Sequence, residues 1–141
     1  MSKTLTLNVF TPNGLFCSEQ VSAFLIPTEL GPLMVEPGYT NLITMLKPSG
    51  VMWIKRGIQT SYYAIFGGAL RMSQGDKADL YCEEINDGYE IDMARAIAAR
   101  DRSLDRIAKP ESEEELKMAK LKLAKSLARI DAKSLSEGKR G

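Results

Sequence analysis

The chain has 141 residues, enough for one ordinary domain or for one small domain with an appendage, but too few for two domains with large cores. Hydrophobic residues make up 44%, charged residues 26%, and the net charge is +1, which argues against a disordered chain or a general nucleic-acid binder. The two cysteines, Cys17 and Cys82, lie far apart without CxxC spacing, so neither a disulfide framework nor a thiolate metal site is indicated.

The chain up to about Glu84 consists of short runs of alternating polar and apolar residues separated by turn residues. The runs fall at residues 5–9, 21–26, 33–35, 41–46, 51–55, 61–66, 70–72 and 77–82. Alternation with a turn every ~8–12 residues is typical of antiparallel strands in a sandwich or barrel. Since the N-terminus alternates where a secretory signal would be continuously apolar, and no run approaches the ~18 apolar residues of a spanning helix, we expect a chain that is neither secreted nor membrane-spanning.

The composition changes abruptly at Asn86-Asp-Gly88, after which Ala, Leu, Lys, Arg and Glu dominate and favour helix. We therefore predict a domain boundary here, with a β domain at residues 1–86 and a helical hairpin at residues 89–137. The first helix is expected from about Ile91 to Ala108. Its predicted apolar stripe comprises Met93, Ile97, Leu104 and Ala108.

Pro110 interrupts the helical pattern, because proline cannot continue the hydrogen-bond ladder. Ser112 and Glu115 have capping-box spacing, so a second helix is expected to begin here and to run to about Leu135. Its apolar residues recur at helical spacing: Leu116, Ala119, Leu123, Leu127 and Ile130. Both stripes are thin and rich in alanine, so we expect the hairpin to need a docking surface and residues 134–141 to fray.

The chain contains no histidine, which excludes Ser-His-Asp and Cys-His nucleophile arrangements and any zinc site that uses histidine. Neither G-x-x-x-x-G-K-[ST] nor G-x-G-x-x-G occurs, and Gly67-Gly68, between two strand-like runs, predicts a tight bend instead. Aromatic residues are few and not interleaved with basic ones, so nucleic-acid binding is only a weak alternative. We therefore expect a protein that is not an enzyme.

The second helix has an asymmetric charge distribution: glutamates open it at 113–115, and residues 116–135 carry six basic residues and one acidic residue. One interpretation is complementarity to the helix dipole, with solvated faces between. The sharper interpretation is an interaction surface. Four basic residues lie along one side of the helix and form what we call the basic ridge, suited to an acidic partner: Lys122, Lys125, Arg129 and Lys133.

The first helix opens with Ile91-Asp92-Met93-Ala94-Arg95-Ala96, where Asp92 and Arg95 have the spacing of a routine intrahelical ion pair. A second interpretation is a ligand site. Arginine binds phosphates through several N–H donors, so Arg95 could bind the phosphates of a free nucleotide. Three residues across the hairpin could assist it: Arg102, Lys125 and Arg129.

The order of these features resembles the epsilon subunit of the rotary (F-type) ATP synthases over nearly the whole chain. Residues 5–14 are similar to the family's first strand and turn, residues 31–50 follow its central loop, and residues 62–70 resemble its paired-glycine strand. Ile91-Asp92-x-x-Arg95-Ala96 matches the family's (Ile/Leu)-Asp-x-x-Arg-Ala signature. The family's Pro-Gly-His-Ala-Pro-Leu run appears at residues 37–42 as Pro-Gly-Tyr-Thr-Asn-Leu.

The resemblance implies an antiparallel β-sandwich followed by a C-terminal α-helical hairpin, in a non-catalytic rotor subunit of a proton- or sodium-translocating ATP synthase. The sandwich would grip the gamma shaft subunit and touch the c-ring near Glu36 and Tyr39. When the hairpin extends, the basic ridge would contact the catalytic beta subunit, next to the alpha subunit. This contact would hinder ATP hydrolysis. The resemblance implies no nucleic acid, and a location peripheral to the cytoplasmic face of the bacterial inner membrane.

No cofactor is obligatory, but in some bacterial members of the family ATP binds the folded hairpin as a regulatory ligand. The resemblance therefore implies ATP contacts at Ile91, Asp92, Arg95 and Ala96, with further candidates at Arg102, Lys125 and Arg129. Two alternatives stay open. One is a hairpin whose main role is ATP sensing, and the other is an unrelated β-sandwich adaptor whose basic tail binds nucleic acid.

Overall fold

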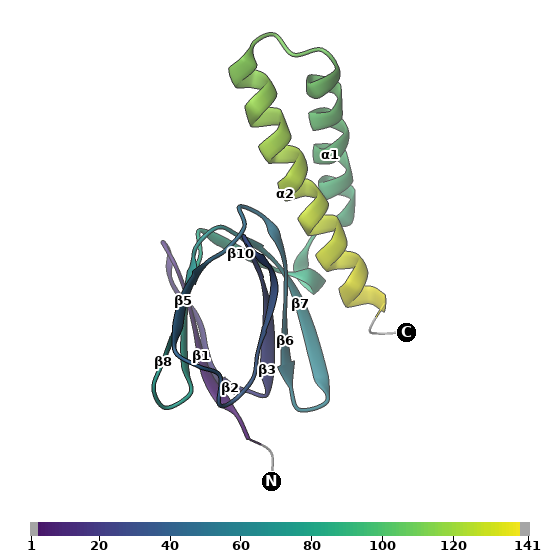
Figure 1. Cartoon of the computed structure of the whole chain (residues 1–141). Helices are drawn as coiled ribbons and strands as arrows, with labels where there is room; N and C mark the ends of the chain where they lie inside the picture. Colours follow the sequence, from purple (N-terminus) through teal and green to yellow (C-terminus); the bar gives the residue numbers. More distant parts are fainter. Residues whose placement is uncertain (1–2, 139–141) are drawn as a thin grey trace.

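The computed structural model describes residues 3–138 and shows a two-layered β-sandwich with a helical hairpin that docks on one sheet and projects beyond it (Figure 1). The strands are β1 (Leu5–Thr11), β2 (Gly14–Val21), β3 (Ala23–Thr28), β4 (Gly31–Val35), β5 (Leu42–Met45), β6 (Gly50–Arg56), β7 (Gln59–Phe66), β8 (Ala69–Ser73), β9 (Lys77–Tyr81) and β10 (Glu84–Asp87). The 3₁₀ helix η1 (Gly88–Glu90) leads into α1 (Met93–Ala108) and α2 (Glu113–Gly138). The predicted fold class, a sandwich followed by a helical hairpin, is confirmed.

The first sheet has the strand order β2-β1-β9-β8-β5 and the second the order β10-β7-β6-β3-β4. Antiparallel pairs dominate, as the turn-rich sequence predicts, but β1 and β9 run in parallel, with Thr6 opposite Lys77 and Phe10 opposite Tyr81. Parallel neighbours cannot be joined by a tight turn, and here the connection between them includes four strands of the second sheet, β3, β4, β6 and β7. Alternation alone does not reveal such a pairing, since both orientations have a period of two residues.

The chain crosses from the second sheet to the first at Gly67-Gly68, between β7 and β8. Both glycines have positive φ angles, 66° and 116°. A Cβ on Gly68 would lie 1.7 Å from the carbonyl oxygen of Tyr81, so the bend requires glycine for its space as well as for its backbone conformation. The predicted tight bend is confirmed.

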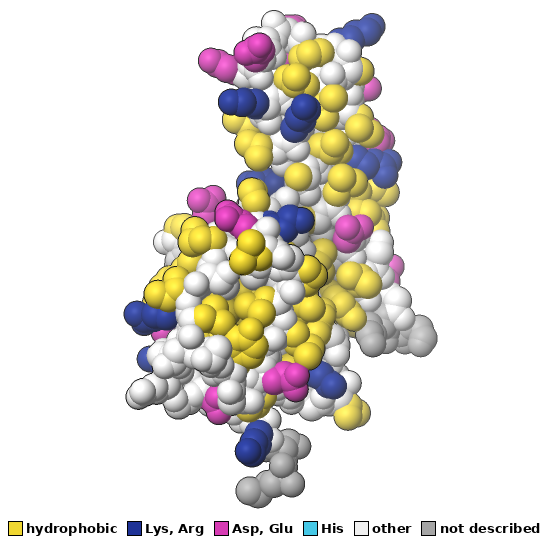
Figure 2. Space-filling view, in the orientation of Figure 1, with side chains coloured by type: hydrophobic (Ala, Val, Ile, Leu, Met, Phe, Trp, Pro, Cys, Tyr) yellow, Lys and Arg dark blue, Asp and Glu magenta, His cyan; other side chains and the backbone are white. Residues whose placement is uncertain are grey.

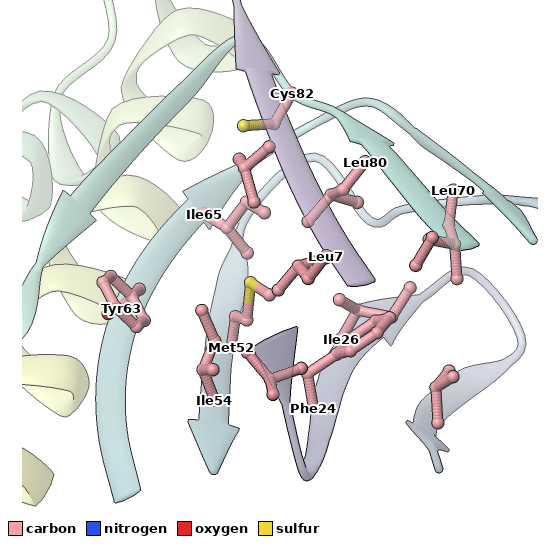
Figure 3. Packing of buried hydrophobic residues seen from close by; sticks show 14 of the residues in the cluster. Leu7, Phe24, Ile26, Met52, Ile54, Tyr63, Ile65, Leu70, Leu80 and Cys82 are labelled. Carbon is pink, nitrogen blue, oxygen red and sulfur yellow. The ribbon is translucent and has the colours of Figure 1, made fainter. Parts of the chain in front are cut away.

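The inward-facing apolar side chains of both sheets meet in one core (Figure 3), where Leu7, Phe24, Ile54 and Leu80 are all completely buried. Cys82 belongs to this core and Cys17 packs against it, and both are free thiols. Burial raises the pKa of each thiol to about 11, so both stay protonated at neutral pH.

An ion pair joins the two sheets where β2 lies near β6. Arg56 donates through Nε and Nη2 to both carboxylate oxygens of Glu19, with 2.8 Å between Nη2 and Oε2, and Nη2 also donates to the Tyr63 hydroxyl at 3.0 Å. The hydrogen bonds from Arg56 lower the pKa of the Glu19 carboxyl.

The hairpin rests on the outer face of the second sheet, as its thin apolar stripes led us to expect. Helix α2 contacts β6, β7 and η1, while α1 packs against α2. Ala64 and Phe66 of β7 form a second apolar cluster with Ala128 and Ala132 of α2. Among the helices of the described residues, none is both long enough and apolar enough to cross a membrane.

The predicted apolar stripe of the first helix is wrong. Ile97 and Leu104 are 36% and 47% exposed, whereas the buried residues of α1 are Ala96 and Ser103. The buried residues of α2 are likewise small: Ala119, Ser126, Ala128, Ala132 and Ser136. Of the α2 residues, Ala128 and Ala132 pack against β7 and Ser136 lies over Gly88. The larger residues Ile97, Leu104 and Leu127 are exposed.

Helix α1 begins at Met93, two residues later than predicted, because Asp92 acts as its N-cap. The Asp92 carboxylate accepts a hydrogen bond from the backbone N–H of Arg95 at 3.2 Å. Among the ion pairs of residues 3–138, none joins Asp92 to the Arg95 guanidinium, so the predicted intrahelical ion pair is replaced by a cap.

Helix α2 begins at Glu113, and Ser112 accepts the backbone N–H of Glu115 at 3.0 Å, which is one half of the predicted capping box. The Glu115 carboxylate accepts from Arg106 instead. The prediction that residues 134–138 fray is wrong, because the helix continues to Gly138 and buries Ser136 against its surroundings. Residues 139–141, for which fraying was also predicted, lie outside the described residues.

Replacing a core leucine should destabilise the sandwich far more than replacing a surface leucine. Leu7→Ala should lower the free energy of unfolding by about 2–5 kcal/mol, because the lost methyl groups leave a cavity in a close-packed core. Leu30→Ala, at a side chain 97% exposed, should change it by less than ~0.5 kcal/mol. Urea unfolding followed by circular dichroism measures both, and equal losses would contradict this core assignment.

The Arg56–Glu19 pair should make stability depend on pH in the acid range. The pKa of Glu19 is below its ordinary value of 4.5 in the folded protein. Its stabilising contribution is therefore complete above that ordinary value and is lost as the pH falls through the folded pKa. Urea unfolding at several pH values should show Glu19→Gln less stable than the parent chain at pH 7, with the difference shrinking in acid. A difference that is constant with pH would refute the assignment.

Candidate functional site

A groove of about 560 Å³ runs along the seam between α1 and α2, and we call it the seam groove. Five basic and two acidic residues line it, a net charge of +3: Arg102, Arg106, Lys122, Lys125, Arg129, Asp105 and Glu115. The remaining lining includes Ala99, Ser103, Ala119 and Ser126, all of which have short side chains. This charge balance favours an anionic ligand.

A second hollow, of about 500 Å³, lies at the base of the hairpin where α1 begins beside β10 and η1, and we call it the base hollow. Three basic and four acidic residues line it, a net charge of −1: Arg95, Arg102, Arg129, Glu84, Asp87, Glu90 and Asp92. Its apolar lining includes Phe16, Ile85 and Ile91. Because Ala99, Arg102 and Arg129 belong to both hollows, the two adjoin.

The structure brings the predicted nucleotide contacts together in these two hollows. Ile91, Asp92, Arg95 and Ala96 line the base hollow, Lys125 lines the seam groove, and Arg102 and Arg129 line both. Contact with a nucleotide itself stays a prediction. Within residues 3–138, no three His, Cys, Asp or Glu side chains are grouped so that they could hold a metal ion.

The arginines of the two hollows differ in whether their guanidinium groups already bind other protein groups. Across residues 3–138, the guanidinium groups of Arg95 and Arg102 take part in no hydrogen bond or ion pair with the protein. Arg129, by contrast, donates through Nη2 to Glu84 at 2.9 Å and through Nε to Asn86 at 3.0 Å. Arg95 and Arg102 are thus the uncommitted donors of the site.

The structure places most of the basic ridge against the β domain. Lys125 Nζ lies 5.3 Å and Arg129 Cζ 4.8 Å from the ring centroid of Phe66, within the range of cation–π interaction. Lys133 Nζ donates to the carbonyl oxygen of Tyr89 at 2.9 Å. Lys122 is exposed. In this position three of the four ridge residues are therefore held by the chain's own β7, β10 and η1.

Acidic and basic side chains meet where the hairpin joins the sandwich (Figure 2). The Arg129–Glu84 ion pair lies at this junction, and its two side chains are 29% and 42% exposed. Pairs of this exposure contribute about 0–1 kcal/mol each, since solvent screens them. This ion pair therefore adds little to the free energy that holds α2 on the sandwich.

Glu36 and Tyr39, the predicted c-ring contacts, lie elsewhere, in the loop between β4 and β5. The backbone N–H of Tyr39 donates to the Glu36 carbonyl oxygen at 3.2 Å, and Gly38 N donates to Asp76 at 2.7 Å. Glu36 is exposed, whereas Tyr39 is half-buried and packs against the sandwich core. Of the two side chains, Glu36 is the more accessible to a partner, and the contact stays a prediction.

Sequence reasoning missed several residues that shape the site. Phe66 could have been found, because Tyr63-Ala-Ile-Phe66 is a continuous apolar run, which indicates a strand covered on both faces. Glu84 and Asn86, which hold Arg129, carry no periodic signal. Arg106 donates to Glu115 at 2.8 Å across the hairpin, a contact that raises the pKa of Arg106 and that spacing alone does not predict.

Comparison with known proteins identifies the sandwich first. Residues 4–85 match the family model described as the ATP synthase, Delta/Epsilon chain, beta-sandwich domain. The ATP synthase epsilon chain of Bacillus velezensis is 29% identical over 129 residues, which cover 92% of this chain and 96% of the relative. That of Pelotomaculum thermopropionicum is 36% identical over 107 residues, which cover 76% of this chain and 78% of the relative.

Solved structures share the fold. A chain of the Euglena gracilis mitochondrial ATP synthase, in the structure of its OSCP/F1/c-ring in rotational state 1, superposes with a TM-score of 0.80 at 19% identity, covering 94% of this chain and 81% of that one. A chain of the Tetrahymena thermophila ATP synthase central stalk/c-ring superposes with a TM-score of 0.61 at 12% identity, covering 94% and 98%. At these identities the likeness concerns the fold. Because the family model spans more than half of the chain and close relatives extend through the hairpin, the protein belongs to the ATP synthase delta/epsilon chain family.

Proposed function

We propose that this chain is a non-catalytic rotor subunit of an ATP synthase central stalk, which couples the catalytic head to the c-ring. The names of its bacterial relatives and the F1/c-ring and central stalk/c-ring assemblies that contain its structural neighbours support this proposal. The sandwich binds the gamma shaft subunit and reaches the c-ring through the loop that carries Glu36 and Tyr39. The subunit is peripheral to the cytoplasmic face of a bacterial inner membrane, in a complex that couples proton or sodium movement to ATP synthesis.

In this proposal the hairpin also restrains ATP hydrolysis, and the observation that carries this part is how α2 is held. Its docking face includes the small residues Ala128, Ala132 and Ser136 together with the partly buried Ile130. The ridge cations beside them contact Phe66 and the Tyr89 carbonyl oxygen. Alanine and serine bury far less apolar area than leucine or isoleucine, and the gain from burial scales with that area. Most of the α2 side chains in the contact are small, so Phe66 and Ile130 supply much of the apolar area that docking buries. Release of α2 frees the basic ridge for an acidic segment of the catalytic beta subunit, next to the alpha subunit.

ATP sensing is a second candidate function, favoured by the two adjoining hollows. The phosphates of ATP suit the seam groove, where the net charge is +3 and Arg102 is uncommitted. The base suits the base hollow, where carboxylates can accept its amino group and Phe16 and Ile91 supply apolar surface. ATP bound in this way would touch both helices and β10 at once. It would therefore stabilise the docked position over the extended one.

Reversing the charge of the exposed ridge residue should weaken the restraint on hydrolysis. Lys122 is exposed and is not among the ridge residues held by β7, β10 and η1, so Lys122→Glu should leave docking intact, although it also lowers the positive charge of the seam groove. Inhibition of ATP hydrolysis by the assembled complex should fall by about two- to five-fold, the effect of losing ~0.5–1 kcal/mol from one exposed charge pair. Lys120→Glu is the matched control, since this exposed lysine lies off the ridge. Equal inhibition by the two variants would contradict the ridge as the contact surface.

Removing an uncommitted arginine should weaken ATP binding to the isolated chain. Arg102→Ala should raise the Kd for ATP by roughly ten-fold or more, because a hydrogen bond to a charged group contributes about 1.5–3 kcal/mol. Arg100→Ala is the matched control, since Arg100 pairs with Asp101 and lines neither hollow. Isothermal titration calorimetry measures both. An absence of binding by the parent chain at millimolar ATP, or equal losses in the two variants, would reject the ATP site.

A further inference from the structure

Gly88 of η1 is buried beneath the last turns of α2. A Cβ at this position would lie 2.0 Å from Ser136 Oγ, 2.6 Å from the Ala132 carbonyl oxygen and 2.8 Å from the Tyr62 carbonyl oxygen. These distances are too short for any side chain, and two of the three obstacles are backbone atoms, which cannot rotate away. Gly88 is not among the glycines with a positive φ angle, so its space, and not its backbone conformation, requires glycine.

We propose that the close packing of Ala132 and Ser136 against Gly88, which we call the steric latch, lets α2 lie near enough to the β domain for the ridge cations to bind there. The latch rests on the proposed function, in that it assumes a hairpin with two positions. It adds to that function the residue that decides how firmly the docked position is kept.

The geometry around Gly88 explains why one close approach controls several contacts. Lys133, between Ala132 and Ser136, donates to the Tyr89 carbonyl oxygen, one residue after Gly88. Arg129, one turn earlier on α2, reaches Glu84 and Asn86 of β10, just before Gly88. A displacement of α2 by the size of one methyl group would lengthen all of these hydrogen bonds together.

The contact at Gly88 is steric and not polar. Ser136 Oγ donates to the Ala132 carbonyl oxygen of its own helix at 2.8 Å, so its hydrogen bond survives whether α2 is docked or free. Helix α2 therefore loses no internal hydrogen bond on leaving the sandwich. The short distance between α2 and η1 requires small side chains on α2 and a glycine opposite them. A larger group on either side should favour release of α2 from the β domain.

The first test adds a methyl group at position 88. Gly88→Ala should accelerate hydrogen exchange of the α2 amides at residues 128–136 in the full chain by roughly ten-fold or more, the effect expected from overpacking a close contact. Amides of β1 and β9, in the sheet opposite the one on which α2 docks, should keep their exchange rates. Gly138→Ala is the matched control, because a Cβ on this helical glycine meets nothing within 4 Å.

The second test approaches from the helix, because the Tyr62 oxygen belongs to the sandwich and Gly88→Ala also presses on it. Ser136→Leu leaves the sequence of the β domain unchanged and introduces a residue with high helix propensity, so α2 itself should stay helical. It places a large side chain against Gly88. It should accelerate exchange of the same α2 amides as Gly88→Ala does. Ser134→Leu, at an exposed position of the same helix, should not.

The outcomes separate the latch from the restraint of hydrolysis. The latch is overturned if α2 exchanges within two-fold of the control variants in both Gly88→Ala and Ser136→Leu, or if β1 and β9 lose protection equally in both. If α2 is released in both variants while the assembled complex hydrolyses ATP at the parental rate, the latch is supported and the proposed restraint is refuted.

Discussion

The contact between α2 and the outer face of the second sheet determines what the rest of the molecule presents to its surroundings. It covers Phe66, which would otherwise be an exposed aromatic residue on β7, and it holds Lys125, Arg129 and Lys133 against the chain itself. It also places Arg129 of α2 beside β10 in the base hollow, whereas the seam groove is lined by α1 and α2 alone. Arg129 thus belongs to the basic ridge and to both hollows.

The sandwich could be predicted from the sequence because the signals that define it are local. Alternation located its strands, and Gly67-Gly68 marked the crossing between the sheets, where the backbone itself demands glycine. The break at Asn86-Asp-Gly88 marked the end of the strands, and Pro110 separated the two helices. The seven residues expected near a nucleotide lie around adjoining hollows, since they follow from helical spacing and from a family signature. Family membership also sets aside the alternative of an unrelated adaptor.

The packing of the hairpin could not be predicted, because it reverses the usual assumption that large apolar residues face inward. Ala96, Ser103 and Ala119 are buried, while Ile97 and Leu104 remain at the surface of the hairpin. A hydrophobic pattern shows which side chains are large and apolar. Close packing of a helix favours small side chains, which such a pattern does not mark. The order of residues 134–138 was missed as well, since Ser136 is buried beside Gly88, a contact between residues far apart in the sequence.

The central claim, that α2 is either docked on its own sandwich or extended toward a partner, is tested most directly by a distance within the assembled complex. Spin labels on Lys55→Cys of β6 and Ser134→Cys of α2 would report it, since the native thiols stay protonated and react slowly. The account predicts one short distance with saturating ATP and a second, much longer distance when hydrolysis is inhibited without ATP. A single short distance in every state, the inhibited one included, would contradict it.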